Sequence, residues 1–229
     1  MQLYGQTSHS IPQKIFIIIA ETVILIASYY ILFAGGAEAT GRIFNAEFTA
    51  GNYDRRLIIF IFNIVVYLRM WITLGYLLKR KIPMEEMFSI PLAFSLYYIG
   101  FAFLVYETQL PLDMLDGLGI FLFVVGSLVN TGSELQRNQW KKDPAHKGKL
   151  YTQGLFRYAM HINYFGDLLW VSGYAIITRN WYAISIPLFL FCFFAFFNIP
   201  QLDKYLQEKY GQAFDNYRKK TKKFIPFVY

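Results

Sequence analysis

Long apolar stretches alternate with short polar ones along this chain. Four runs of about 20 residues lie at about 15 to 36, 57 to 78, 87 to 106 and 113 to 132. Two further runs, at about 164 to 178 and 181 to 200, are separated only by a short polar turn. About 20 helical residues cross the roughly 30 Å hydrocarbon core of a bilayer, where a helix satisfies its own backbone hydrogen bonds. The pattern therefore predicts an all-α, polytopic membrane protein of about six transmembrane helices.

Composition supports this class of protein and narrows the chemistry. Hydrophobic residues make up 55% of the 229 residues and charged residues only 16%, whereas soluble domains have about a quarter of charged residues. The one cysteine, Cys192, lies inside an apolar run, so no disulfide framework is expected. The histidines His9, His146 and His161 lack the spacing of paired metal ligands, and we expect no metal site.

Basic residues predict an orientation. Six Lys and Arg residues lie in the loop from 137 to 157 and seven in the tail from 204 to 223, whereas the opposite side has only Arg42, Arg55, Arg56 and Arg179. By the positive-inside rule both termini face the cytoplasm or an organellar matrix, and the tail is a short amphipathic cytoplasmic segment. The net charge of +7 then reflects topology and affinity for membrane lipids or an anionic cofactor, not for nucleic acid.

Polar groups within the apolar runs are functional candidates, because charge at bilayer depth is energetically unfavourable. Glu21 and Arg69 lie near the middle of the first and second runs. Either they pair with each other and hold two helices together, or they bind a polar group of a lipid substrate. Weaker candidates of the same kind are Asn63, Tyr67, Tyr97 and Tyr98.

The fourth run continues as a helix beyond its apolar part. Its polar residues Asn130, Glu134, Arg137 and Lys141 are spaced i, i+4, i+7 and i+11, which aligns them on one helix face. This row is either a binding face that emerges from the membrane, or a solvated helix end with an i, i+3 Glu-Arg pair.

A second polar face begins the fifth run. Asn163 and Asp167 are four residues apart, and Tyr158 and His161 precede them. As an alternative, these residues form an interfacial aromatic belt in which Asn163 caps the helix. Two polar faces beside one basic loop favour a dinucleotide site open to the cytoplasm, since carboxylates and amides suit ribose and carboxamide groups and cations suit phosphates. The cations are Lys141, Lys147, Lys149 and Arg157.

Two segments carry a family resemblance. The run SELQRNQWKKDPAHKGKLYTQGLFRYAMHINYFGDLLW and the later QLDKYLQEKYGQAFDNYRKKTKKFIPFVY resemble the C-terminal half of the steroid 5-alpha-reductase family. The resemblance covers roughly residues 115 to 229 and implies NADPH-dependent reduction of a carbon-carbon double bond in a sterol, steroid or other enone lipid. It implies an endoplasmic reticulum membrane, with the mitochondrial inner membrane as an alternative. It also implies cofactor contacts at Asn130, Glu134, Lys141, Tyr158, Asn163 and Asp167.

The same resemblance divides the chain into two roles within one membrane domain, residues 1–229. Residues 113–229 are expected to bind the cofactor, and residues 1–112 the lipid substrate. Reduction of an enone requires a hydrogen-bond donor for the developing enolate oxygen. Candidates for this catalytic donor are Glu21, kept protonated by burial, Tyr67, Tyr97 and Tyr98.

Two other functions stay open at this point. The isoprenylcysteine carboxyl methyltransferases have a similar architecture but use S-adenosylmethionine, and their pattern includes Arg-His-Pro and a later Glu-Glu pair. Here Met160 and Ile162 flank His161 in place of the Arg and Pro, and the later pair is missing, which favours the reductases. The third possibility is a non-catalytic, reductase-like subunit of a larger membrane complex.

Overall fold

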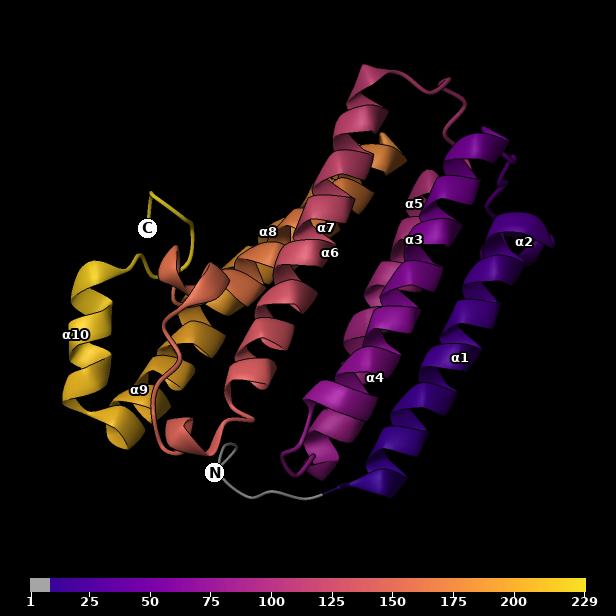
Figure 1. The fold of residues 1–229 in the computed structure, drawn as a ribbon. Helices are drawn as coiled ribbons and strands as arrows, with labels where there is room; N and C mark the ends of the chain where they lie inside the picture. The colour runs from indigo at the N-terminus through magenta and orange to yellow at the C-terminus, as the bar shows by residue number, and fades with distance from the viewer. Residues whose placement is uncertain (1–8) are drawn as a thin grey trace. The chain divides into compact units, whose positions relative to one another are not determined.

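The computed structural model describes residues 9–229, and it confirms the all-α fold (Figure 1). No β-strand is found in this part of the chain. The α-helices are α1 (Ile11–Phe33), α2 (Gly36–Phe44), α3 (Tyr53–Ile72), α4 (Met84–Ser95), α5 (Phe101–Tyr106), α6 (Met114–Trp140), α7 (Ile162–Thr178), α8 (Ser185–Phe193), α9 (Ile199–Tyr210) and α10 (Gln212–Lys220). Short 3-10 helices are η3 (Pro144–His146), η4 (Gly154–Arg157) and η5 (Trp181–Ile184), and π-helical turns are η1 (Thr73–Leu77), η2 (Leu96–Gly100) and η6 (Phe194–Asn198).

Within residues 9–229, five continuous helical stretches are long and apolar enough to cross a membrane. They are Ile11–Phe33, Tyr53–Leu77, Met84–Tyr106, Met114–Trp140 and Trp181–Tyr210. The remaining expected segment corresponds to α7, which has 17 residues and is shorter than the other five. The polytopic prediction is thus confirmed, with five long spans and one short apolar helix.

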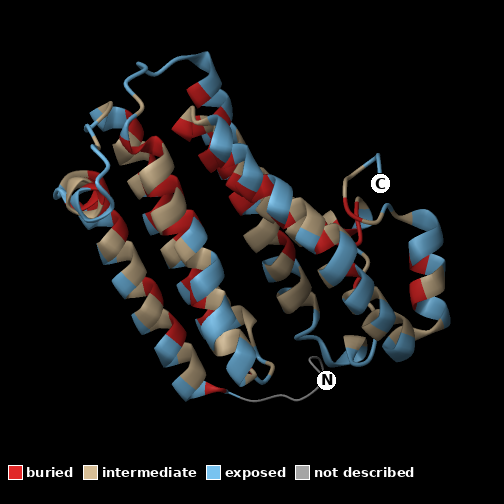
Figure 2. Cartoon of the chain, turned by 180° about the vertical axis from the view of Figure 1, so that it is seen from behind, coloured by how far each residue is buried: buried red, intermediate tan, exposed pale blue. Residues whose placement is uncertain are grey.

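Each long span buries only part of its circumference. In the most apolar window of each span, 28 to 33% of the residues are buried by the rest of the chain. Figure 2 shows these buried positions as short red patches along helices that are otherwise tan or pale blue. Most of each apolar surface therefore faces outward, as a helix surrounded by lipid requires.

Two compact units are distinguished within the chain. Unit 1 comprises the residues up to Ile120 together with Gly173–Ile186, and unit 2 comprises Phe121–Ser172 together with Pro187–Tyr229. In unit 1, α1 packs against α3 and α4, with Ile17, Leu74 and Ile82 fully buried among them.

A buried ion cluster in unit 1 ties the start of α3 to the start of α6. The side chain of Arg55 is completely buried, and its Nη2 donates to Asp116 Oδ2 at 2.9 Å. Its Nη1 donates to the backbone oxygen of Ile177 at 2.6 Å, and Arg179 also pairs with Asp116. Arg55 and Arg179, which the sequence indicated only as loop charges, are therefore internal links between helices.

Close approach of α6 and α7 positions the polar residues of unit 2. A Cβ atom added at Gly126 would overlap the backbone of Trp170, and one added at Gly166 would overlap the backbone of Asn130. Small residues at such crossings are typical of membrane helices, because packing and not water exclusion holds these helices together. The two glycines thus set the short distance between the faces that contain Asn130 and Asn163.

Candidate functional site

The polar faces of α6 and α7 are hydrogen-bonded to each other in unit 2. Asn163 Nδ2 donates to Glu134 Oε1 at 3.0 Å, and Asn130 Nδ2 donates to the backbone oxygen of Asn163 at 3.1 Å. All three residues are half-buried, as is Asp167 on the next turn of α7. The two faces that were inferred separately from periodicity therefore form one polar surface.

Asn163 does not have the capping role that was considered as an alternative. Helix α7 begins at Ile162, and the backbone oxygen of His161 accepts from the N–H groups of Tyr164 and Phe165. Asn163 therefore lies inside the first turn, and its side chain is directed to another helix instead of to its own backbone.

Glu134 is held from two sides. Its second carboxylate oxygen accepts from Arg137 on the next turn of α6, and this guanidinium lies 5.6 Å from the ring centre of Phe156. The expected i, i+3 pair is thus present, but it belongs to the inter-helix polar surface. Because Asn163 and Arg137 both bond to Glu134, the carboxylate is fixed in position on this surface.

Asn138 is a residue of this face that the sequence reasoning missed. It lies four residues after Glu134 and three before Lys141, so it shares their side of α6. Its Nδ2 is buried and has no hydrogen-bond partner within residues 9–229. Its spacing could have identified it, but a single amide near a helix end is not distinctive. An unsatisfied buried donor is unfavourable and indicates a missing acceptor.

The cations predicted to bind phosphate lie in the same unit, and Lys141 is close enough to Glu134 and Arg137 to interact electrostatically with both. Lys141 and Arg157 are exposed, and the Arg157 guanidinium lies 4.6 Å from the ring centre of Tyr158 and donates to its hydroxyl. Although Lys141 is exposed as a whole, partial loss of water around its ammonium and the positive charges of Arg137 and Lys209 lower its pKa to about 8. These cations can neutralise an anion, as phosphate binding requires.

Asp167 lies one turn beyond Asn163 and holds an indole. Trp170 Nε1 donates to Asp167 Oδ1 at 2.8 Å, and Trp170 is buried. The spacing of three residues makes this contact local to α7. The predicted carboxylate is thus oriented by its own helix.

His161 is directed to the C-terminal part of unit 2. Its ring is 1% exposed, and its Nε2 lies 2.8 Å from Asp203 Oδ1. Asp203 also pairs with Lys223 at 3.5 Å, and the His161 backbone N–H donates to the oxygen of Lys223. His161 therefore links the start of α7 to α9 and to the tail.

Met160 and Ile162 lie in packed apolar clusters. Met160 is buried with Phe214 and Tyr217, and its N–H donates to the oxygen of Lys222 at 2.8 Å. Ile162 packs in another cluster that includes Phe156. Both side chains, which flank His161 in the sequence motif, fill the interior of unit 2. Met and Ile, in place of Arg and Pro, therefore suit the apolar packing at these two positions.

A second group of candidates lies in unit 1. Glu21 on α1 is completely buried, and Tyr97 and Tyr98 on η2 are 8% and 0% exposed. The Tyr98 hydroxyl lies close enough to the Glu21 carboxyl to interact with it, but the contact is not aligned as a hydrogen bond, and neither group has another partner in the described chain. The Glu21–Arg69 ion pair, one of the two alternatives that the sequence left open, is thus not formed through a hydrogen bond to Glu21 in the described chain. The π-helical turn that contains both tyrosines is of a kind often found at functional sites.

A series of buried hydrogen bonds connects side chains of α1, α3 and α7 in the same unit. Tyr174 donates to Asn63 Oδ1 at 2.9 Å, and Asn63 Nδ2 donates to Ser28 Oγ at 3.1 Å. Tyr98 joins it through its backbone oxygen, 3.5 Å from Asn63 Nδ2. Sequence reasoning identified Asn63 but missed Ser28 and Tyr174, since a serine or tyrosine in an apolar span has no distinguishing pattern.

The chain is similar to one protein family and to several individual proteins. The family model described as "Protein of unknown function (DUF1295)" matches residues 84–221, which is more than half of the chain. The chain is 30% identical over 131 residues to mouse 3-oxo-5-alpha-steroid 4-dehydrogenase 2, covering 56% of this chain and 50% of the relative. It is 32% identical over 114 residues to the human 3-oxo-5-alpha-steroid 4-dehydrogenase 1, covering 49% and 41%.

A relative with a different named activity also matches. The chain is 36% identical over 92 residues to "Probable O-methyltransferase ustE" of Ustilaginoidea virens, covering 40% of this chain and 32% of that protein. The chain therefore spans half or less of the length of the curated relatives named here. The family match and the shared motif region nevertheless agree, and the protein belongs to the DUF1295 family, a steroid 5-alpha-reductase-like family of membrane proteins.

Proposed function

We propose that this protein reduces a carbon-carbon double bond conjugated to a carbonyl group in a steroid, sterol or other enone lipid, with NADPH as reductant. The observation that carries this proposal is the buried Glu21–Tyr98 pair. The Glu21 carboxyl and the Tyr98 hydroxyl are buried close to each other, and neither forms a well-aligned hydrogen bond with any group of residues 9–229. Buried polar groups are normally satisfied, so this pair favours a polar ligand group, and a lipid carbonyl is one that suits an apolar membrane environment.

The two side chains suit an electrophilic role. A phenol hydroxyl and a protonated carboxyl can both donate a hydrogen bond to a carbonyl oxygen. Such donors stabilise the negative charge that develops on this oxygen when the conjugated double bond is reduced. Tyr97, in the same π-helical turn, is a further candidate in this group. The Ser28–Asn63–Tyr174 chain supports their positions by fixing α1, α3 and α7 within unit 1.

The polar surface of unit 2 has the composition that a dinucleotide requires. Exposed Lys141 and Arg157 suit phosphates, and the unsatisfied Nδ2 of Asn138 lies on the same helix face as Lys141. Asn130, Asn163 and Asp167 offer amide and carboxylate groups for carboxamide and ribose, with Glu134 and Arg137 bonded into the same surface and Tyr158 next to Arg157. His161 then acts as a positioning residue, because its ring is already engaged by Asp203. When bound, NADPH supplies a hydride.

Substitutions in unit 2 test cofactor binding, and substitutions in unit 1 test turnover of the lipid. In purified protein, we expect Asn163→Ala and Asp167→Ala to weaken NADPH binding by about tenfold or more, since each removes a polar contact. Glu21→Gln and Tyr98→Phe should keep NADPH affinity but lose turnover of an enone steroid. Gln212→Ala, an exposed substitution on α10, is the control for binding. Unchanged NADPH affinity in both α7 variants would refute the cofactor assignment.

One observation favours a second function, S-adenosylmethionine-dependent methyl transfer. It is the similarity over 92 residues to a relative named as an O-methyltransferase. Thermal stabilisation distinguishes the two, because a ligand that binds the native state raises the melting temperature. Stabilisation by NADPH and not by S-adenosylmethionine supports the reductase, and the reverse result supports the methyltransferase.

A further inference from the structure

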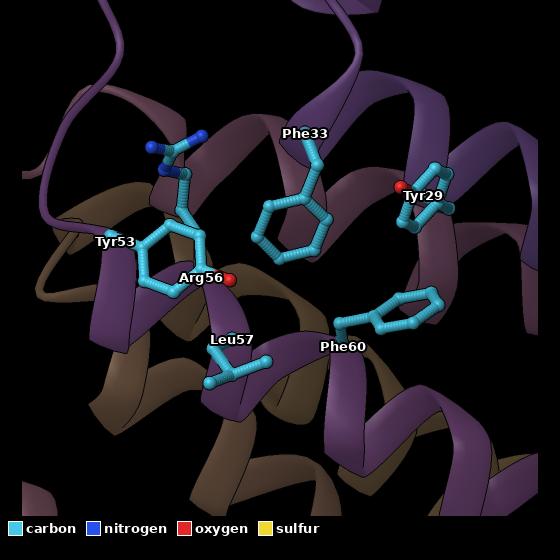
Figure 3. Close-up of a pocket in the computed structure, with 6 residues that line it drawn as sticks. All are labelled: Tyr29, Phe33, Tyr53, Arg56, Leu57 and Phe60. Carbon is cyan, nitrogen blue, oxygen red and sulfur yellow. The ribbon is translucent and has the colours of Figure 1, made fainter.

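A pocket of about 320 Å³ lies on unit 1 between α1 and α3 (Figure 3). It is lined by Tyr29, Phe33, Tyr53, Arg56, Leu57 and Phe60. On the same two helices, Ser28 and Asn63 point into the interior and are buried, whereas Tyr29 and Tyr53 are exposed. The pocket therefore opens on the outer face of this helix pair and is separate from the Glu21–Tyr98 group.

The pocket lies where both spans end. The first membrane span ends at Phe33 and the second begins at Tyr53. Aromatic side chains at this depth are common in membrane proteins, because they suit the boundary between hydrocarbon and headgroups. An aromatic belt, however, has no need of a cavity or of a half-buried cation with a buried N–H group. The pocket therefore suits a molecule that is polar at one end and apolar at the other.

Arg56 is the polar end of the pocket. Its guanidinium carbon lies 5.7, 5.9 and 5.4 Å from the ring centres of Phe33, Tyr53 and Tyr106, and Nη1 donates to the backbone oxygen of Leu32. The guanidinium is therefore fixed by several contacts. Its Nε is nonetheless buried without a hydrogen-bond partner in the described chain. An unsatisfied N–H on a cation favours an anionic oxygen as its acceptor.

A carboxylate near Arg56 restricts the charge of the ligand. Glu38 interacts electrostatically with Arg56, and the hydrogen bond from the Tyr106 hydroxyl, with smaller contributions from Arg56 and Arg42, lowers the pKa of Glu38. Glu38 is thus ionised at neutral pH, and its Oε2 is buried and also lacks a hydrogen-bond partner among residues 9–229. A headgroup with both a phosphate and an ammonium suits these two charges better than a purely anionic one.

We propose that this pocket binds the headgroup of a zwitterionic phospholipid, with the phosphate at Arg56 and the first methylene groups against Phe33, Leu57 and Phe60. A volume of about 320 Å³ is at the lower end of the usual range for ligand pockets, roughly 300 to 1,000 Å³. It therefore accommodates a headgroup and the upper part of the chains, while the remaining chain length stays in the bilayer.

The test compares two lipids with the same acyl chains, phosphatidylethanolamine and diacylglycerol, which lacks the phosphate. Native mass spectrometry of the full-length protein in detergent measures how much of each lipid stays bound. We expect wild type to retain phosphatidylethanolamine about tenfold more strongly, the equivalent of one charge-assisted hydrogen bond, and Arg56→Gln to lose this preference. Lys79→Gln, which removes an exposed cation in the loop after η1, should keep it.

A second variant covers the case in which Arg56→Gln does not fold. Leu57→Trp retains the cation but fills the pocket, so it should reduce retention of phosphatidylethanolamine while circular dichroism stays helical. Equal retention of the two lipids by wild type would overturn the proposal. So would undiminished phosphatidylethanolamine retention in folded Leu57→Trp protein. Neither outcome depends on enzymatic turnover, which makes this test independent of the proposed reductase activity.

Discussion

Asn163 Nδ2 donates to Glu134 Oε1 at 3.0 Å, across 29 residues of sequence and between two helices of unit 2. The contact joins two residues that local periodicity had assigned to separate faces. Because Glu134 also accepts from Arg137, the amide and the guanidinium share one carboxylate. The Glu134 carboxylate therefore links α6 to α7.

Asn163→Ala should lower stability as well as cofactor affinity. The substitution leaves Glu134 Oε1 without its donor, and loss of one partner of a half-buried hydrogen bond typically costs about 1–3 kcal/mol. Thermal unfolding in detergent measures this loss. Gln212→Ala removes an amide from the exposed surface of α10, where it bonds only to Asn216, and should leave the melting temperature nearly unchanged. Equal melting temperatures of both variants would show that the Asn163–Glu134 contact does not stabilise the fold.

Binding of a phosphate ligand should depend on pH through Lys141. The pKa of this lysine is lowered to about 8, so the ammonium is charged below that pH and is neutral above it. Affinity for NADPH should therefore be highest below about pH 8 and decrease as the pH rises through that value. Isothermal titration between pH 6.5 and 9 measures the dependence.

Lys141→Arg is the control for this pH dependence, because a guanidinium stays protonated throughout the range. We expect the variant to bind NADPH with nearly constant affinity up to pH 9. If Lys141→Arg and wild type have the same pH profile, another group causes the dependence.

Gly126→Ala should destabilise the α6–α7 crossing. A Cβ at this position overlaps the backbone of Trp170, so the helices must separate. Overpacking of this kind typically costs about 1–3 kcal/mol. Gly132→Ala is a matched control on the same helix, because a Cβ there meets nothing within 4 Å. The control should be neutral or more stable, by about 0.5–1 kcal/mol, since alanine favours helix more than glycine does. The difference in melting temperature between the two variants is the measurement.

Asp203→Asn should loosen the C-terminal tail. The Asp203 carboxylate contacts both the His161 ring and the Lys223 ammonium. The backbone oxygens of Lys222 and Lys223 in turn accept from the N–H groups of Met160 and His161. Trypsin should cleave after the tail lysines faster in this variant, at unchanged helix content. Asp215→Asn, which affects a more exposed carboxylate of α10, is the control. Equal cleavage rates of Asp203→Asn and wild type would contradict a role of the His161–Asp203 contact in holding the tail.

Local regularities made part of this structure predictable from sequence. Apolar runs of about 20 residues located the spans, because the thickness of the bilayer sets the length of a crossing helix. The 3.6-residue period aligned Asn130, Glu134, Arg137 and Lys141, and also Asn163 and Asp167, since positions on one helix face depend only on nearby residues. The motif around these positions also indicated the steroid 5-alpha-reductase-like family.

Contacts between segments that are distant in sequence could not be predicted from local patterns. Tyr174 bonds to Asn63 across 111 residues, Arg55 bonds to Ile177 across 122, and His161 reaches Asp203 across 42. Nothing in the local pattern specifies a partner on another helix, because that choice depends on how whole helices pack. The same packing directs Met160 and Ile162 inward. The local sequence therefore determines where helices form and which residues share a face. Tertiary packing determines the partner of each polar group.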